Sequence, residues 1–366
     1  MADGWDFSHR VTSIGGGYIW PDLTIFSDGE RTVLLSRATP ERPQTPFRYI
    51  NQVAPVISAL DFERGVDDFV TRVIERLDAM GIRDSNLARI WRDVQEERVD
   101  PEQGRRRKIE ALMGVDPDES DPDVIERVLA DAGRLGLGAM EELAADVGSS
   151  GGVREVFSAD QLTEHARRNG FAAAFGDAVQ LAGAVTTPAR AQLPAWQLGA
   201  EAAKALRTQE RLGCDAIDDA VLAALMGVRA EALTKTNADA VLAISFALKQ
   251  GAGDDRVLLR SRYATGRRFE LARLLGDRLL GKAGDALYPA TRSTTYRQKA
   301  QRAFAAELLS PFDEVTAMLD GDYSAENQQE VAEHFKVSEM TIRTQLVNHR
   351  VLDRDELESG EFALAA

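Results

Sequence analysis

Three charged side chains share one face of a helix-forming stretch, residues 267–280, which reads RRFELARLLGDRLL. Glu270, Arg273 and Asp277 are spaced i, i+3 and i+7, so Arg273 has an opposite charge three and four residues away on the same stripe. Carboxylates in this arrangement can pair with the guanidinium, or serve as metal ligands and proton acceptors. The spacing predicts a Glu270–Arg273–Asp277 ion-pair ladder, and it leaves open whether the ladder is buried or lies on the surface.

Side chains for metal binding or nucleophilic attack are sparse. The four histidines are His9, His165, His334 and His349, and they contain no His-x-x-x-His pair. The single cysteine, Cys214, lies in RLGCDAID, where the neighbouring acids disfavour a thiolate. One cysteine also excludes an internal disulfide. We therefore expect no cofactor and no cysteine nucleophile.

Composition is that of a soluble globular protein. The chain has 366 residues, of which 44% are hydrophobic and 28% charged, with a net charge of −15. There is no apolar run of about 18 residues, so we expect no membrane span. The start, MADGWDFSHR, lacks a signal-peptide pattern. These features indicate a cytoplasmic protein, and they leave its oligomeric state open.

Positive charge is concentrated in residues 256–302, which hold twelve Arg or Lys against three Asp or Glu. One interpretation is a surface for an anionic partner, such as nucleic acid or an acidic protein. The other is that these arginines balance the acidic remainder of the chain. Under the first interpretation the candidate contacts are Arg256, Arg260, Arg262, Arg267, Arg268, Arg297, Lys299 and Arg302.

The first 147 residues predict a small module followed by helices. Apolar stretches around Asp28-Gly29 predict a β-hairpin of about 22–27 and 30–36. Residues 62–80 place their apolar side chains on one helical face. Three more helices are expected at 85–98, 102–114 and 120–136.

The remainder of the chain predicts further helices and one short strand. Residues 153–230 are Ala-rich and predict helices only, including 194–213 and 215–228. Val257–Leu259 predict the strand, and helices are expected at about 266–280 and 296–309. The expected fold is mostly α (α+β). Its expected divisions are a module at 1–82, a helical region at 83–147, a linker at 148–152, a C-terminal domain at 153–366 with its core at 195–352, and an acidic tail at 353–366.

Three motifs in order resemble the ImmA/IrrE family of zinc metallo-endopeptidases. The first is the helix just described, with Arg268-Phe269 and Leu275-Gly276 at matching positions. The second is Phe304–Leu309, reading FAAELL and followed by Pro311. The third is a helix-turn-helix-like tail around Val331 to Ser338. The resemblance covers roughly 195–352 and implies a zincin-like domain.

The same resemblance places the family's metal site where this chain lacks ligands. The His, Glu and His of the HExxH motif fall on Arg273, Leu274 and Asp277, and residues 296–303 contain no acid for the third ligand. A catalytic zinc needs three protein ligands, an open water position and a general base. The resemblance therefore implies a degenerate zinc site, with the charged ladder in the place of the metal.

The tail predicts two helices, with Val331, Ala332, Phe335, Val337, Ile342 and Leu346 as core positions and Ser338 as the cap of the second helix. If that helix read DNA, Thr341, Arg343, Thr344, Gln345 and Asn348 would face the groove. Residues 325–354 carry four basic and five acidic side chains, which favours structural packing over DNA reading.

Three functions follow from these patterns. The leading one is a non-catalytic pseudo-peptidase that binds a protein partner; the family resemblance implies a helix-turn-helix repressor or a toxin–antitoxin or mobile-element component. One alternative is an active zinc endopeptidase with unusual ligands such as Glu270, Asp277 and His334. Another is a DNA-binding regulator that uses the tail and the basic block. No ligand is assigned to the N-terminal module.

Overall fold

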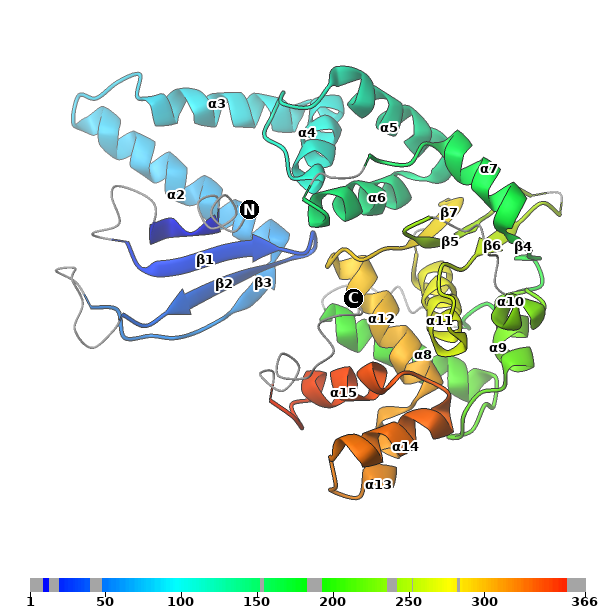
Figure 1. The fold of residues 1–366 in the computed structure, drawn as a ribbon. Helices are drawn as coiled ribbons and strands as arrows, with labels where there is room; N and C mark the ends of the chain where they lie inside the picture. Colours follow the sequence, from blue (N-terminus) through cyan, green and yellow to red (C-terminus); the bar gives the residue numbers. More distant parts are fainter. Residues whose placement is uncertain are drawn as a thin grey trace. The chain divides into compact units, whose positions relative to one another are not determined.

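The computed structural model describes residues 9–12, 20–39, 48–151, 155–182, 193–235, 242–251, 253–281 and 284–353. It is mostly helical with two small sheets, so the predicted mostly α (α+β) class is confirmed (Figure 1). The chain forms two compact units. Unit 1 comprises Met1–Glu119 with Thr294–Tyr296, and unit 2 comprises Ser120–Ser293 with Arg297–Ala366.

The sheet of unit 1 has three antiparallel strands in the order β1-β2-β3: β1 (Asp22–Ser27), β2 (Arg31–Arg37) and β3 (Val56–Ser58). The predicted hairpin is confirmed within one residue of its expected bounds. Gly29 has φ +99°, and the Asp28 carboxylate accepts a hydrogen bond from the Arg31 amide at 3.0 Å, which closes the turn.

Three helices follow in unit 1: α2 (Ala59–Ala79), α3 (Asn86–Val99) and α4 (Pro101–Met113). Ser58, Ser85 and Asp100 cap their N-termini through side-chain oxygens that accept from backbone amides. The amphipathic pattern of the first two helices predicts an inward face. Yet every residue of α2 and of α3 stays at least partly exposed to solvent.

Unit 2 begins with α5 (Pro122–Leu135), α6 (Leu137–Ser149) and α7 (Ala159–Asn169). The two units divide at Glu119–Ser120, earlier than the expected linker at 148–152, and α6 continues into the first residues of that segment. The physical reason is that α6 is largely buried, and the Ala286 amide donates to the Leu135 carbonyl at 3.0 Å. These helices therefore belong with the C-terminal half.

A second antiparallel sheet lies in unit 2, with strand order β4-β6-β5-β7. Its strands are β4 (Phe171–Ala172), β5 (Ser245–Leu248), β6 (Arg256–Leu258) and β7 (Leu287–Ala290). β6 confirms the predicted short strand. The expectation of helices alone over 153–230 is wrong at β4, because a two-residue edge strand is too short to show an alternating pattern.

Helix α11 (Ala264–Leu280) is central to unit 2, with Leu271, Ala272, Leu274 and Leu275 fully buried. Around it lie α8 (Ala195–Gln209), α9 (Asp219–Leu225), α10 (Glu231–Thr234) and α12 (Tyr296–Leu309). Small residues permit the close helix contacts. A Cβ on Gly276 would lie 2.6 Å from the Phe304 ring, and one on Gly199 would lie 2.2 Å from the Ala300 carbonyl oxygen.

The chain continues into α13 (Phe312–Leu319), α14 (Ala325–Phe335) and α15 (Glu339–Asn348). All six predicted core residues of this tail are buried. Ser338 accepts from the Thr341 amide and caps α15 as predicted. The acidic tail expected at 353–366 lies outside the described residues from 354 onward. Of the helices that the structure describes, none combines the length and apolar character needed to cross a bilayer.

We expect the contact between α8 and α12 to be intolerant of a methyl group. Gly199→Ala should lower the free energy of unfolding by about 1–3 kcal/mol, because the added Cβ meets backbone atoms that have no rotamer to change. Gly133→Ala, in α5 with nothing within 4 Å of the added Cβ, should raise it by about 0.5–1 kcal/mol. Urea denaturation followed by circular dichroism measures both, and equal effects of the two variants would contradict this account.

Candidate functional site

The charged stripe on α11 lies in the interior of unit 2. Asp277 is 1% exposed and Glu270 is 7% exposed, while Arg273 is partly buried. The alternative of surface ion pairs on an ordinary helix is therefore wrong for the two carboxylates. Burial at this level requires each charge to have a partner.

Arg297 on α12 is that partner for Asp277. Its Nε and Nη2 atoms donate to the two Asp277 carboxylate oxygens at 2.6 and 2.8 Å, and its Nη1 donates to Asp285 at 3.0 Å. Burial alone would lower the pKa of Arg297, but Asp277 and Asp285 raise it well above its usual range. One guanidinium thus joins α11, α12 and the segment before β7.

Arg273 has different partners from those predicted. Its Nη2 atom donates to the Thr291 carbonyl at 2.8 Å and to the side-chain oxygen of Gln298 at 2.5 Å. Burial lowers the pKa of Arg273, and the neighbouring Arg302 lowers it further. The predicted ladder within α11 is wrong, because longer-range partners reach these side chains inside the fold.

Glu270 binds the segment that precedes α11. Its carboxylate accepts from the Ser261 amide at 2.9 Å, and Arg260 lies 3.6 Å away. The three charges of the stripe therefore have three separate sets of partners. Together they tie one helix to three other parts of unit 2.

Two glutamines occupy the part of α12 where the family resemblance requires an acid. Gln298 and Gln301 are almost fully buried, and both side-chain amides donate to the Pro289 carbonyl, at 3.0 and 3.1 Å. The Gln298 oxygen also accepts from the Thr291 amide at 2.9 Å. These glutamines join α12 to β7. They carry no catalytic or metal signal in the sequence, so they could not be predicted from it.

The start of α6 packs against the cluster formed by Asp277, Arg297 and Asp285. A Cβ on Gly136 would lie 2.2 Å from an Asp285 carboxylate oxygen, and one on Gly138 would lie 3.1 Å from Arg297. Asp146, also on α6, accepts from the Arg292 amide at 2.9 Å. Burial lowers the pKa of Arg302, and Glu142 and Asp146 partly oppose that effect. No motif or spacing in the sequence indicated that α6 takes part.

These residues do not fit the zinc ion that the family resemblance implies. Leu274, at the general-base position, is fully buried in the apolar core, and both oxygens of Asp277 bind Arg297. Within the described part of the chain, no group of three or more His, Cys, Asp or Glu side chains is placed to hold a metal ion. The unusual ligand set of Glu270, Asp277 and His334 is therefore not assembled.

The basic block of residues 256–302 contains candidate contacts for an anionic partner that the structure buries. Arg267 and Arg268 are each 2% exposed. Arg267 donates to the Ala232 and Ser261 carbonyls, whereas Arg268 donates to the Ile217 and Lys336 carbonyls and pairs with Asp219. The prediction that these two arginines contact an anionic partner is wrong, since their donors are used by carbonyls at helix and loop ends.

The remaining members of the block differ in exposure. Arg297 is paired as described, and Arg302 donates to the Thr291 and Ser293 carbonyls. Arg256 and Arg260 are partly exposed, while Arg262 and Lys299 are exposed. Arg256, Arg260 and Arg297 form ion pairs with acids of unit 2, so the block mainly serves its own unit.

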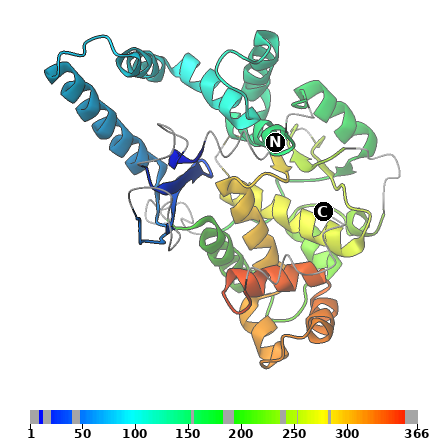
Figure 2. The ribbon, with the colours of Figure 1, turned by 60° about the vertical axis from the view of Figure 1, so that its left-hand side comes forward.

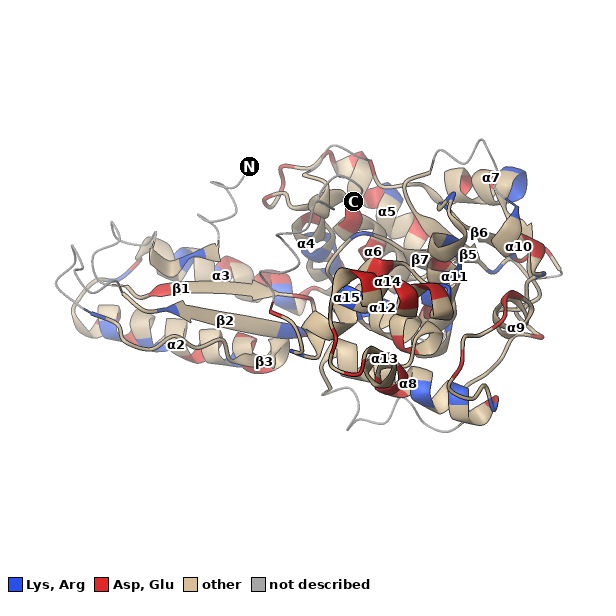
Figure 3. Cartoon of the chain, turned by 60° about the horizontal axis from the view of Figure 1, so that its bottom comes forward, with Lys and Arg blue, Asp and Glu red and all other residues tan. Residues whose placement is uncertain are grey.

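Two of the five predicted reading residues of the helix-turn-helix-like tail are buried. Thr341 is 9% exposed and Gln345 is 5% exposed, and Gln345 exchanges hydrogen bonds with Ser310 at 3.1 and 3.0 Å. Arg343 and Thr344 are partly buried, and Asn348 is exposed. Figure 3 shows the acidic side of α14, where Glu326, Glu330 and Glu333 are exposed. This surface opposes the approach of a phosphate backbone.

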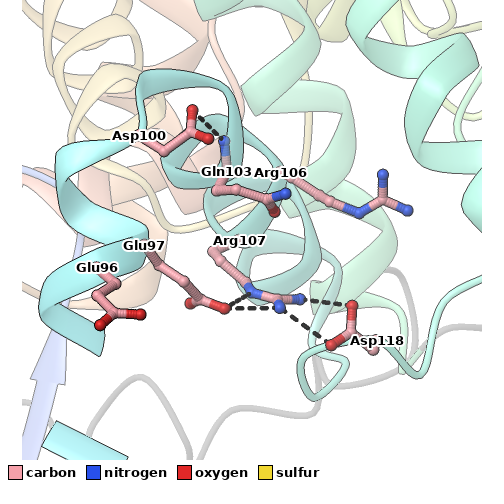
Figure 4. Close-up of a pocket in the computed structure, with 7 residues that line it drawn as sticks. All are labelled: Glu96, Glu97, Asp100, Gln103, Arg106, Arg107 and Asp118. Atoms are coloured by element: carbon pink, nitrogen blue, oxygen red, sulfur yellow. Dashed lines mark hydrogen bonds and ion pairs between the residues drawn. The ribbon is translucent and has the colours of Figure 1, made fainter. Parts of the chain in front are cut away.

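Unit 1 contains a pocket of about 440 Å³ between the end of α3, the start of α4 and Asp118 (Figure 4). Arg107 crosses it and donates to Glu97 at 2.7 Å, to Glu110 at 2.9 Å and to Asp118 at 3.0 Å. These bonds raise the pKa of Arg107 above its usual range, and they lower the pKa of Asp118. Arg107 therefore joins α3 to α4, and its guanidinium already has three acidic partners.

A scan of family models, a search of curated proteins and a search of solved structures each found no match to this chain. The resemblance to the ImmA/IrrE family therefore stays a prediction from the sequence motifs.

We expect the Asp277–Arg297 pair to support unit 2 as a whole. Asp277→Ala should lower the free energy of unfolding by about 3–5 kcal/mol, because it leaves a buried guanidinium short of a partner. The triple variant Asp277→Leu/Asp285→Asn/Arg297→Met, which also neutralises the second carboxylate that Arg297 binds, should recover much of this loss. Urea denaturation measures each variant.

The matched control for this pair is Glu231→Ala, which removes an ion pair whose members are 61% and 66% exposed. It should leave the denaturation midpoint unchanged. If Asp277→Ala were as mild as Glu231→Ala, the cluster would not support the unit in the way described.

Proposed function

We propose that this chain is a non-catalytic binding protein of the cytoplasm, built on the helical plan of an ImmA/IrrE-type peptidase and acting through a protein partner. The observation that carries the proposal is the Asp277–Arg297–Asp285 cluster, which uses the carboxylate at the second ligand position for an ion pair. Arg273 at the first ligand position adds a positive charge that would repel a metal cation.

The nature of the partner comes from the family resemblance alone. It implies a helix-turn-helix repressor, or a component of a toxin–antitoxin or mobile-element system. The acidic exposed face of α14 supports a protein partner over direct DNA binding. Burial of Thr341 and Gln345 adds to this support, since a reading helix needs those side chains at its surface.

Elemental mass spectrometry on untagged protein purified without chelators tests the non-catalytic part. We expect far less than one zinc per chain, and no cleavage of a co-expressed repressor. About one zinc per chain that is lost in Asp277→Ala would contradict the proposal. Glu231→Ala serves as the control, because it removes a carboxylate far more exposed than Asp277.

A gel-shift titration at low salt tests the DNA-binding alternative. We expect no shift with DNA from upstream of the chain's own gene, because the exposed Glu326, Glu330 and Glu333 of α14 repel phosphate and Thr341 and Gln345 of α15 are buried. A shift abolished by Arg343→Ala or Asn348→Ala would instead favour a DNA-binding regulator.

A further inference from the structure

The sheet of unit 2 has β7 at one edge, so one side of this strand has no neighbouring strand. An edge strand offers unpaired backbone groups to which an extended segment of another chain can add as a further strand. Whether β7 can accept such a segment depends on the partners of its outward backbone groups.

The pairing of β7 with β5 fixes which of its groups point outward. The Lys249 amide donates to the Ala286 carbonyl at 2.7 Å, so Ala286 faces β5. Every second residue of an antiparallel strand faces the same neighbour, so Ala290 also faces β5, whereas Pro289 and Thr291 face outward. Because proline has no N–H, these two residues offer three outward groups: the two carbonyls and the Thr291 amide.

The side-chain amide of Gln298 binds two of these groups as an adjacent strand would. Its Nε2 donates to the Pro289 carbonyl at 3.0 Å, and its Oε1 accepts from the Thr291 amide at 2.9 Å. These partners lie on either side of Ala290. A peptide group of a parallel neighbouring strand makes the same two bonds, to residues two apart. One glutamine of α12 therefore takes the place of a strand residue beside β7.

The third outward group is bound as well. The Thr291 carbonyl accepts from Arg273 of α11 at 2.8 Å and from Arg302 of α12 at 3.2 Å. Gln301 adds a second donor to the Pro289 carbonyl at 3.1 Å. Helices α11 and α12 lie side by side in both views of the ribbon (Figures 1 and 2), so both reach the same edge.

These contacts lie in the interior of unit 2. Gln298 is 0% exposed, and Gln301 and Thr291 are each 1% exposed. An incoming strand would need the same groups of β7 that the glutamines bind. The glutamine amides would then be left inside the fold without partners, which is unfavourable.

We propose that α11 and α12 close the outer edge of β7 to strand addition, with Gln298 in the place of the adjacent strand. No extended segment of a protein partner, or of a second copy of this chain, then pairs with this edge. The inference goes beyond the proposed function, because it excludes one mode of docking for the partner proposed above. Its test needs no partner, so its outcome is separate from that of the proposed function.

Amide hydrogen exchange of the full chain, resolved by residue, tests the proposal. In the wild type the Thr291 amide should exchange within about tenfold of the rate of the Ala247 amide, which lies inside the sheet opposite Tyr288. In Gln298→Ala the ratio of the Thr291 rate to the Ala247 rate should rise by about tenfold or more. The matched control is Gln301→Ala, which keeps both bonds of Gln298 and should leave this ratio within about twofold.

The ratio separates opening of the edge from a general loss of stability, because a general loss speeds exchange of both amides. Gln298→Met, which removes the amide and retains a side chain of similar length, should raise the ratio in the same way. Exchange of Thr291 in the wild type at the rate of an unstructured amide would mean an open edge and would overturn the proposal. An unchanged ratio in both Gln298 variants would also overturn it.

Discussion

The buried ion pair between Asp277 and Arg297 is the constraint on which much of unit 2 depends. Two charges removed from water need near-complete hydrogen bonding, and here Arg297 meets it with Asp277 and Asp285 together. This requires α11, α12 and the segment before β7 to meet at one point. It also requires a residue without a side chain at Gly136, where α6 approaches Asp285.

The same residues bear on function. A zinc peptidase needs ligand atoms with free lone pairs and an open coordination position. In this chain the corresponding carboxylate accepts two hydrogen bonds from one guanidinium, and glutamines bridge α12 to β7. Such an arrangement stabilises the fold and supports the proposal that the helical plan serves binding.

The two units use their apolar residues differently. In unit 2 they form one continuous core that includes α11, α12 and the tail helices. In unit 1, no residue of α2 or α3 is buried, although both helices have amphipathic sequences. The apolar side chains of unit 1 are thus much less buried than those of unit 2.

The sequence by itself determined the features that depend on neighbouring residues. Asp28-Gly29 predicted the hairpin, the apolar periods predicted α2, α3, α11 and α12, and the tail's six core residues were all identified, because turns, caps and helical faces are local. Only the tertiary structure decided the partners of the charged residues. Arg297 lies 20 residues from Asp277, and α6 lies more than 100 residues from either, so no spacing rule could join them. Burial of Arg267 and exposure of Phe69 were decided in the same way, by which other elements the fold places beside each helix.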